Sequence, residues 1–356
     1  MIYWLFATPG LSRRDALFLY DNNDLEDLWR KPPNNFLLKR RDEKLLSAEI
    51  TELNKRGIWV VSYGGLGYPE SLMNIDDPPM LLYGMGKMPD DALPKIAVIG
   101  SRKCTSYGLR TTKKLARGLV NAGFVIVSGM AFGIDTQSHI TAIDTVIEEY
   151  GEDAAPPVTI AVLGCGVDIC YPSLNLDIYG RIQRYGCVVS EYPPGTHPMP
   201  FMFPQRNRII TGLSMGIIVV EAAVKSGTSR TVDIALSQGR EVFVVPGCID
   251  SMYSAGTNNL IKEGAKLVTS YKDVVYELRQ ELGNETPNGE HNIMKNMYEN
   301  MLNEEIAIMK QLSGEPVDTG YLAAATEMAM QDLMYYLSRL EISGMVKTVG
   351  NGIIKL

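Results

Sequence analysis

The sequence predicts an α/β protein whose largest part is a doubly wound, mostly parallel sheet. Seven short apolar runs alternate with helical stretches through the middle of the chain, and these runs are continuous in Val and Ile rather than alternating with polar residues. Continuous apolar strands are buried on both faces, which is typical of parallel sheets covered by helices on either side. We therefore expect a Rossmann-like domain over residues 81–280, with strands at 96–99, 124–127, 159–163, 187–190, 217–221, 242–245 and 266–269.

Residues 1–80 predict a small helical, SAM-like domain. Amphipathic periodicity indicates three helices, at 15–20, 25–29 and 43–56. Ile58–Ser62 then predicts a strand, followed by a glycine-rich turn. The turn Pro9-Gly10-Leu11-Ser12 has some features of a helix-hairpin-helix, a motif that holds DNA phosphates on backbone N–H groups. It lacks the second glycine of that motif, so we favour packing as the role of this domain.

The C-terminal part predicts a linker at 281–296, which is polar and turn-rich, and a winged helix at 297–356. Helical patterns occur at about 303–312, 319–326 and 328–342, and the turn Gly350-Asn351-Gly352 indicates a β-hairpin after them. The third of these helices carries one arginine against two acidic residues. Binding to DNA phosphates requires Lys or Arg. We therefore expect this domain to bind protein or to pack, rather than to bind DNA.

Composition and charge limit the classes of function. The chain has 356 residues, 46% hydrophobic and 21% charged, and five cysteines without pairing or zinc-binding spacing. These values predict a cytoplasmic protein of two or three domains with reduced thiols. We find neither a signal peptide nor an apolar run long enough to span a bilayer, so no membrane association is expected. Residues 95–280 carry 18 Lys and Arg against 16 Asp and Glu within a chain of net charge −7, so a polyanion should contact the middle domain.

Small and polar residues follow several of the predicted strands, and the carboxyl ends of parallel strands meet at one rim, where ligands bind. Gly100-Ser101-Arg102 follows the first strand, with Lys103 beside it. A turn of this kind before a helix offers N–H groups and the positive end of the helix dipole to an anion. Gly129, after the second strand, permits close approach of a ligand. Lys225–Thr231 predicts a second anion-binding loop, so we expect a phosphate site along this rim.

Arg206, Asn207 and Arg208 precede a short predicted helix, directly after Phe201 and Phe203. Cations interleaved with aromatic rings suit a single-stranded nucleic acid, since the charges contact phosphates and the ring faces stack on bases. We favour the core for the two phenylalanines and a ligand contact for at least one arginine. Glu191, at the end of the fourth strand, is the best-placed carboxylate for acid–base chemistry, or else it holds Arg206 or Arg208 in position.

Six motifs in a fixed order give the chain a family resemblance. They are Gly100-Ser-Arg, Ser128-Gly-x-Ala-x-Gly-Ile-Asp135, Gly164-x-Gly-x-Asp-x-x-Tyr-Pro172, Ser190-Glu191, Phe203-Pro-x-Arg-Asn-Arg-Ile-Ile-x-Gly-Leu-Ser214 and Lys225-Ser-Gly-Thr228. Over nearly its whole length the sequence resembles the DprA/Smf family, the DNA-processing proteins of bacterial transformation. The resemblance implies a homodimer that binds and protects single-stranded DNA and loads the recombinase RecA onto it. Two departures are an acidic insertion at 148–157 and the incomplete hairpin motif near Gly10.

The resemblance also implies which residues contact DNA. Gly100, Ser101 and Arg102 would hold a phosphate, and two further segments would contribute to the same pocket: Arg206, Asn207 and Arg208, and Lys225, Ser226 and Gly227. We expect neither enzymatic activity nor a cofactor.

Two other functions compete with this interpretation. A similar fold serves nucleotide phosphoribohydrolases, in which a glutamate near a Pro-Gly-Gly-x-Gly-Thr loop cleaves an N-glycosidic bond. This chain has Glu221 and Ser226-Gly-Thr228 in that neighbourhood, but no Pro-Gly-Gly and no evident nucleophile–base pair. His139 lies within a predicted helix, where a structural role is favoured. A nucleotide-sensing regulator is disfavoured by the few basic residues of the third C-terminal helix. No Gly-x-Gly-x-x-Gly follows the first strand, which disfavours a dinucleotide.

Overall fold

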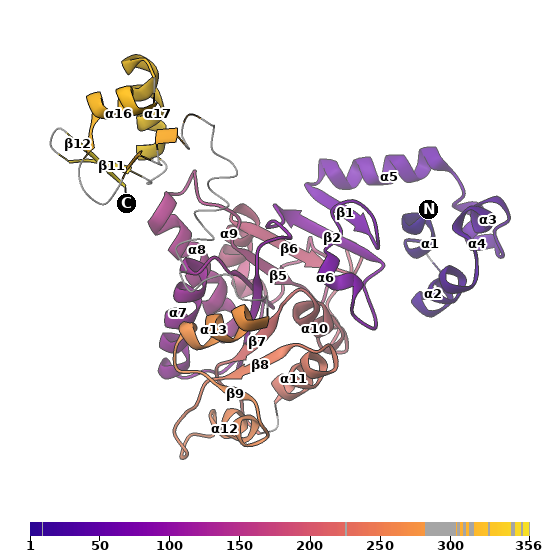
Figure 1. Cartoon of the computed structure of the whole chain (residues 1–356). Helices are drawn as coiled ribbons and strands as arrows, with labels where there is room; N and C mark the ends of the chain where they lie inside the picture. The colour runs from indigo at the N-terminus through magenta and orange to yellow at the C-terminus, as the bar shows by residue number, and fades with distance from the viewer. Residues whose placement is uncertain are drawn as a thin grey trace. The chain divides into compact units, whose positions relative to one another are not determined.

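The computed structural model describes residues 1–281 except Pro9 and Lys225, together with residues 304, 307–308, 311–312, 317–326, 328–342, 346–349 and 352–355 of the C-terminal part. The chain divides into two compact units (Figure 1). One comprises Met1–Val146 and Pro156–Glu285, and the other comprises Ile147–Ala155 and Thr286–Leu356. Almost all of the predicted linker and most of the helix expected at 303–312 lie outside the described residues.

The first unit contains a nine-stranded sheet with the order β1-β2-β6-β5-β4-β3-β7-β8-β9. Seven strands run parallel, at the positions the sequence predicts: β3 Lys95–Ile99, β4 Val125–Ser128, β5 Thr159–Val162, β6 Gly186–Ser190, β7 Gly216–Val219, β8 Glu241–Val244 and β9 Lys266–Leu267. All five residues of β3 are buried, as the continuous apolar run requires. The mostly parallel α/β fold is therefore confirmed.

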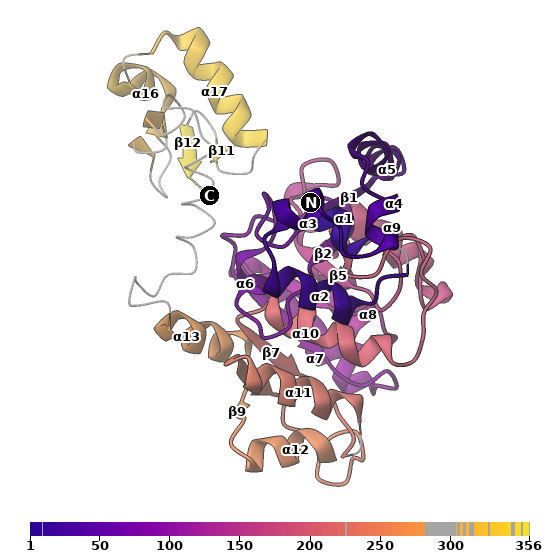
Figure 2. The same cartoon turned by 90° about the vertical axis from the view of Figure 1, so that its right-hand side faces the viewer.

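Helices cover both faces of this sheet because the chain reverses its direction once. From β3 it proceeds through β4 and β5 to β6, and right-handed crossovers place α7 (Ser106–Asn121), α8 (Ile134–Tyr150) and α9 (Leu176–Arg184) on one face. It then returns to β7 and continues to β8, which places α10 (Met202–Gly212) and α11 (Gly227–Ser237) on the other (Figures 1 and 2). Two further helices complete this unit beside the late strands: α12 (Ala255–Lys262) and α13 (Tyr271–Glu281).

The edge of the sheet contains one strand, β2, that was not predicted from the sequence. β2 (Leu81–Gly86) pairs antiparallel with both β6 and β1 (Ile58–Ser62). β1 occurs where it was predicted, but it belongs to the large sheet although its residues fall within the segment expected to form a separate helical domain. Residues 1–146 likewise belong to one compact unit.

The N-terminal helices surround a small core of their own, made by Trp4, Leu5, Ala16, Leu28 and Leu37. The helices are α1 Ile2–Phe6, α2 Arg13–Asn22, α3 Leu25–Arg30, α4 Asn35–Lys39 and α5 Glu43–Lys55, and α6 (Glu70–Met73) follows β1. Side-chain oxygens of Ser12, Asp24, Asn34 and Asp42 cap the starts of α2 to α5. α1 and α4 were not predicted, since five residues are too few to display a helical period. Pro9 of the possible hairpin motif lies outside the described residues.

Between residues 317 and 355, the described part of the second unit forms two helices and a small antiparallel sheet. The helices are α16 (Thr319–Thr326) and α17 (Met330–Ile342), and the sheet has the order β10-β12-β11. Its strands are Val317–Asp318, Gly352–Lys355 and Val346–Val349 respectively. Leu322, Leu333, Leu337, Leu340 and Ile353 form its core. The winged helix stays a prediction. No helix in the described part of the chain has the length and apolar character needed to cross a membrane.

Candidate functional site

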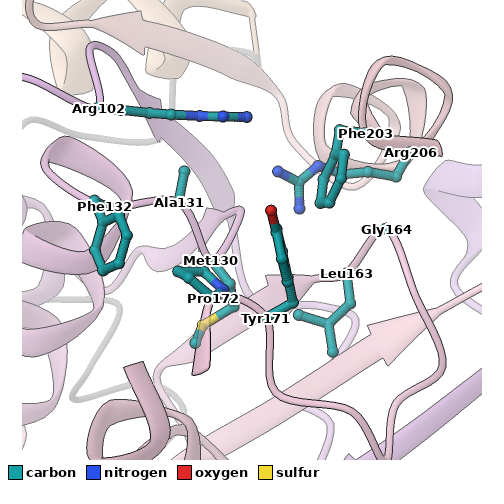
Figure 3. Close-up of a pocket in the computed structure, with 10 residues that line it drawn as sticks. All are labelled: Arg102, Met130, Ala131, Phe132, Leu163, Gly164, Tyr171, Pro172, Phe203 and Arg206. Carbon is teal, nitrogen blue, oxygen red and sulfur yellow. The ribbon is translucent and has the colours of Figure 1, made fainter. Parts of the chain in front are cut away.

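A pocket lies at the carboxyl ends of β3, β4 and β5, and its empty space, including the open solvent at its mouth, is about 450 Å³. Figure 3 shows Arg102 and Arg206 entering it from different elements, the loop after β3 and helix α10, with Tyr171 between them. The residues that line it are Arg102, Met130, Ala131, Phe132, Leu163, Gly164, Tyr171, Pro172, Phe203 and Arg206. The position agrees with the rule that doubly wound sheets bind ligands beyond the carboxyl ends of their strands.

The loop after β3 is shaped by Gly100 and Ser101 and carries two exposed cations. A Cβ on Gly100 would lie 2.7 Å from Ile134 Cγ1, so the loop requires glycine there. The Ser101 N–H donates to the Glu221 carbonyl at 2.8 Å, and the Ser101 hydroxyl accepts from the Lys103 N–H at 3.2 Å. The side chains of Arg102 and Lys103 are exposed, and neither has a hydrogen bond or ion pair with any residue that the structure describes. Both cations are therefore available to a ligand.

The start of helix α7 is occupied by the protein's own carboxylate. Glu221 is buried, and its carboxylate accepts hydrogen bonds from the Thr105 N–H at 2.8 Å and from the Thr105 hydroxyl at 2.5 Å. Thr105 is the N-cap of α7, and a Cβ on Gly108 would overlap this carboxylate. A negative charge at this point is stabilised by the positive end of the helix dipole. A phosphate at the Gly100-Ser101-Arg102 turn would therefore depend on side-chain cations rather than on the start of α7.

Arg206 is a buried cation that reaches the pocket through a gap left by Gly129. Its side chain is 6% exposed, Nη1 donates to the Val162 carbonyl, and Nε donates to Asn207 Oδ1 at 3.0 Å. A Cβ on Gly129 would overlap Arg206 Nη2 and lie 2.6 Å from Asp135 Oδ2. Burial raises the pKa of Asp135 to about 6, although the nearby Arg206 opposes that rise. Arg206 thus places a partly compensated positive charge at the pocket.

Arg208 and Asn207 do not line the pocket, and their side chains connect helix α10 to neighbouring elements. Arg208 donates to both oxygens of Glu191 at 3.0 and 2.7 Å and to Asp77 Oδ2 at 2.9 Å. Burial alone would lower the pKa of Arg208, but the two carboxylates raise it overall. Asn207 donates to Thr231 Oγ1 at 2.9 Å and so connects α10 to α11. Glu191 therefore holds Arg208 in position, which is one of the two roles expected for it.

The described residues of the second predicted anion loop, 226–231, do not line the pocket. Lys225 lies outside the described residues. Ser226 is the N-cap residue of α11 and makes no side-chain capping bond; its hydroxyl is buried without a hydrogen-bond partner among the residues described. Gly227 is exposed, and a Cβ there would meet nothing.

Glu221 and His139, the candidate acid–base groups for a hydrolase, are hydrogen-bonded to other residues of the protein. The Glu221 carboxylate is bound to Thr105, as described above. His139 is fully buried, with Nε2 at 2.7 Å from the Gly129 carbonyl and Nδ1 at 2.7 Å from Thr159 Oγ1. Since a carbonyl only accepts, Nε2 carries a proton, and burial lowers the pKa of His139 to about 4. A neutral, inaccessible imidazole has a structural role.

The aromatic residues of the pocket were predicted less accurately than its arginines. Phe203 lines the pocket, and Phe201 is 55% exposed, so the preference for placing both in the core was wrong. The ring centroids of Tyr171 and Phe203 are 5.3 Å apart with an interplanar angle of 36°. Tyr171 is 46% exposed and Phe132 is 40% exposed. Their occurrence within the motifs Ser128–Asp135 and Gly164–Pro172 was the available signal.

The chain is similar in sequence and fold to known proteins. The family model of DNA recombination-mediator protein A matches residues 45–279. DNA processing protein DprA of Bacillus subtilis is 39% identical over 282 residues, which are 78% of this chain and 89% of that protein. The X-ray structure of DprA from Streptococcus pneumoniae has a TM-score of 0.64 and 35% identity, and the match covers 78% of this chain and 98% of that one.

A second solved structure adds a ligand class for a relative. It concerns the single-stranded DNA binding mode of DprA from Helicobacter pylori, with a TM-score of 0.53 and 29% identity, and the match covers 63% of this chain and 96% of that one. The family model covers well over half of the chain, and the sequence and structural relatives agree with it. This chain therefore belongs to the DNA recombination-mediator protein A family, that of the DprA/Smf proteins.

Proposed function

We propose that this protein binds single-stranded DNA in the pocket that Arg102 and Arg206 share. The observation that carries the proposal is the pair of guanidinium groups, one exposed and one buried, beside partly exposed aromatic rings. Proteins that bind single strands combine cations for the phosphates with ring faces for the bases. The single-stranded DNA binding mode of the Helicobacter pylori relative supports the same ligand class.

The exposed and buried residues of the pocket have different roles in binding. Arg102 and Lys103, which are exposed, contact the phosphate as the strand arrives. Arg206 stabilises the negative charge from within the pocket, where the lower dielectric strengthens its interaction. The rings of Tyr171 and Phe203 contact a base by its face. Phosphates and ring faces carry little base identity, so we expect weak sequence preference.

We further propose that binding, rather than catalysis, is the role of this site. The Glu221 carboxylate is already hydrogen-bonded to Thr105 at the start of α7, and His139 is inaccessible. Asp135, a carboxyl near the pocket, has a pKa raised to about 6, but its burial leaves it poorly placed to reach a substrate. An N-glycosidase would release free base from nucleoside monophosphates, and we expect none.

The family resemblance extends the proposal beyond the pocket. We propose that the protein acts as a homodimer, protects the bound strand from nucleases and transfers it to the recombinase RecA. Sedimentation analysis tests the dimer, and a strand-exchange assay with RecA tests the transfer. A monomer at micromolar concentration, or no stimulation of RecA, would count against these two parts separately.

The primary test measures fluorescence anisotropy of labelled oligonucleotides, single-stranded and double-stranded. Arg102→Ala should weaken single-strand binding about 10- to 100-fold, the value of one or two hydrogen bonds to a charged group. Lys44→Ala, an exposed lysine on α5, is the matched control and should change nothing. The proposal fails if Arg102→Ala binds normally while removal of residues 290–356 abolishes binding.

A further inference from the structure

The sequence around the first pocket loop has an unusual charge composition. Residues 92–134 contain no Asp or Glu, in a chain whose net charge is −7. The same segment contains seven basic residues: Lys95, Arg102, Lys103, Arg110, Lys113, Lys114 and Arg117. Lys95 is buried and donates to the carbonyls of Asp91 and Leu93, which leaves six basic residues to act elsewhere. A concentration of one charge in an acidic protein indicates a binding surface for a polyanion.

Helix α7 gathers these charges into one stripe. Arg110, Lys113 and Lys114 occur at positions i, i+3 and i+4, which share one face of a helix. All three are exposed, whereas Thr112 and Leu115 on the opposite face are buried. None of the three has a hydrogen bond or ion pair within the part of the chain that the structure describes. The stripe is therefore an uncompensated positive surface.

Two acidic residues of the neighbouring helix α13 have other partners. Helix α13 packs on α7 where the ring of Tyr271 meets Gly118. On that helix, Asp273 accepts from the N–H groups of Thr269 and Ser270 at 2.8 and 2.9 Å, and Glu277 pairs with Lys266. These carboxylates are already satisfied locally, so they do not neutralise the stripe on α7.

The stripe begins beside the pocket. Helix α7 starts at Ser106, just after the loop that carries Arg102 and Lys103, and Arg110 lies about one turn into the helix. From Arg110 to Lys114 the helix rises about 6 Å, so the three cations extend from the carboxyl rim of the sheet along its outer surface. A strand that leaves the pocket past Arg102 would meet them next. Arg117, one turn further, is already engaged in another interaction.

We propose that Arg110, Lys113 and Lys114 form a second phosphate-binding surface, which holds single-stranded DNA beyond the nucleotide in the pocket. This inference rests on the proposed function, because the pocket supplies the anchor from which the strand continues. The ten residues that line the pocket enclose a small space that is open to solvent, so it holds only a small part of a strand. The remaining phosphates need cations on the surface, and α7 offers three that have no partner among the described residues.

The test compares oligothymidylates of about 4 and about 20 nucleotides, which cover the range of single-strand site sizes. The full-length triple variant Arg110→Gln/Lys113→Gln/Lys114→Gln should bind the short strand like the wild type. It should bind the long strand about tenfold more weakly, since each exposed contact contributes roughly a factor of two to three. The slope of log affinity against log salt should fall by about 2 for the long strand, at about 0.7 per phosphate contact.

A charge-matched control separates this surface from general electrostatics. The variant Lys44→Gln/Lys87→Gln/Lys262→Gln removes three exposed lysines elsewhere and should leave both affinities and the salt slope unchanged. The inference is overturned if the α7 variant binds the long strand normally, if it loses both strands equally, or if the control loses as much. If Arg102→Ala leaves both strands bound, the proposed function itself fails. Weakening of both strands by Arg102→Ala, with no effect of the α7 variant, would refute only the second surface.

Discussion

Arg102 and Arg208 allow the binding and structural roles of the arginines to be separated by mutation. Arg208 is buried and contacts Glu191 and Asp77, and it does not line the pocket. Arg102 is exposed and lines the pocket. We therefore expect Arg208→Ala to reduce the stability of the protein and to leave the affinity of the folded protein for single-stranded DNA nearly unchanged. Arg102→Ala should have the opposite effects.

The size of the stability loss follows from the burial of the ion pair. The side chains of Arg208 and Glu191 are 10% and 9% exposed, so Arg208→Ala leaves an unpaired carboxylate in the interior. Breaking a buried pair in this way costs about 3–5 kcal/mol. The contact with Asp77, which is 47% exposed, adds less than about 1 kcal/mol because solvent screens it. For a unit of this size the thermal midpoint should fall by about 10 °C.

Circular dichroism melting of the wild type, Arg208→Ala and Arg208→Met/Glu191→Leu provides the measurement. The double variant removes both charges and should recover much of the lost stability, since no buried charge is left unpaired. Anisotropy titrations are then made at a temperature where every variant is folded. A wild-type midpoint for Arg208→Ala, or loss of binding by the folded variant as large as for Arg102→Ala, would refute this division of roles.

Four further predictions concern charge, stability and stacking. Binding of single-stranded DNA should tighten about three- to tenfold as the pH falls from about 7.5 to about 5. The reason is that protonation of Asp135, whose pKa is raised to about 6, removes a negative charge beside the pocket. His139, whose pKa is lowered to about 4, stays neutral over this range. Asp135→Asn should abolish that pH dependence in anisotropy titrations. The raised pKa also means that the contribution of Asp135 to stability is lost as the pH rises through about 6, so the melting midpoint of Asp135→Asn should exceed that of the wild type at neutral pH. Glu221→Gln should lower the melting midpoint by a few degrees, since a charge-assisted bond to Thr105 at the start of α7 contributes about 1–2 kcal/mol. Tyr171→Ala should weaken binding about 5- to 100-fold, the value of one stacked base, whereas Tyr171→Phe should bind normally.

The parallel strands were predictable because a strand buried on both faces has a continuous run of apolar residues. A run such as Ile96–Ile99 is apolar at every position, and this pattern distinguishes a strand covered on both faces. β2 gave no such signal, since it contains Gly84 and Gly86 within six residues. A Cβ on Gly84 would overlap the Trp59 ring of the neighbouring strand, so this glycine serves a packing contact that only the folded sheet reveals.

The sequence did not show which arginine of α10 faces the pocket. Arg206 and Arg208 are two residues apart, so their side chains leave the helix in nearly opposite directions. Both follow the same aromatic segment, and the local sequence does not indicate which one faces the ligand. Residues far away in the chain determine the two orientations. Arg206 donates to the Val162 carbonyl and occupies the space left by Gly129, whereas Arg208 pairs with Glu191 and Asp77.

The position of Glu221 bears on the kind of ligand that the pocket accepts. A pocket for a free nucleotide commonly fixes the phosphate on the N–H groups at the start of a helix, with a defined position and orientation. Here a buried carboxylate occupies that position, and the available charges are the exposed side chains of Arg102 and Lys103. Long flexible cations accept a phosphate in many positions, which weakens selection of a single nucleotide but suits a backbone that passes across the site. The same property is expected of the α7 stripe, so both surfaces favour a polymer over a small ligand.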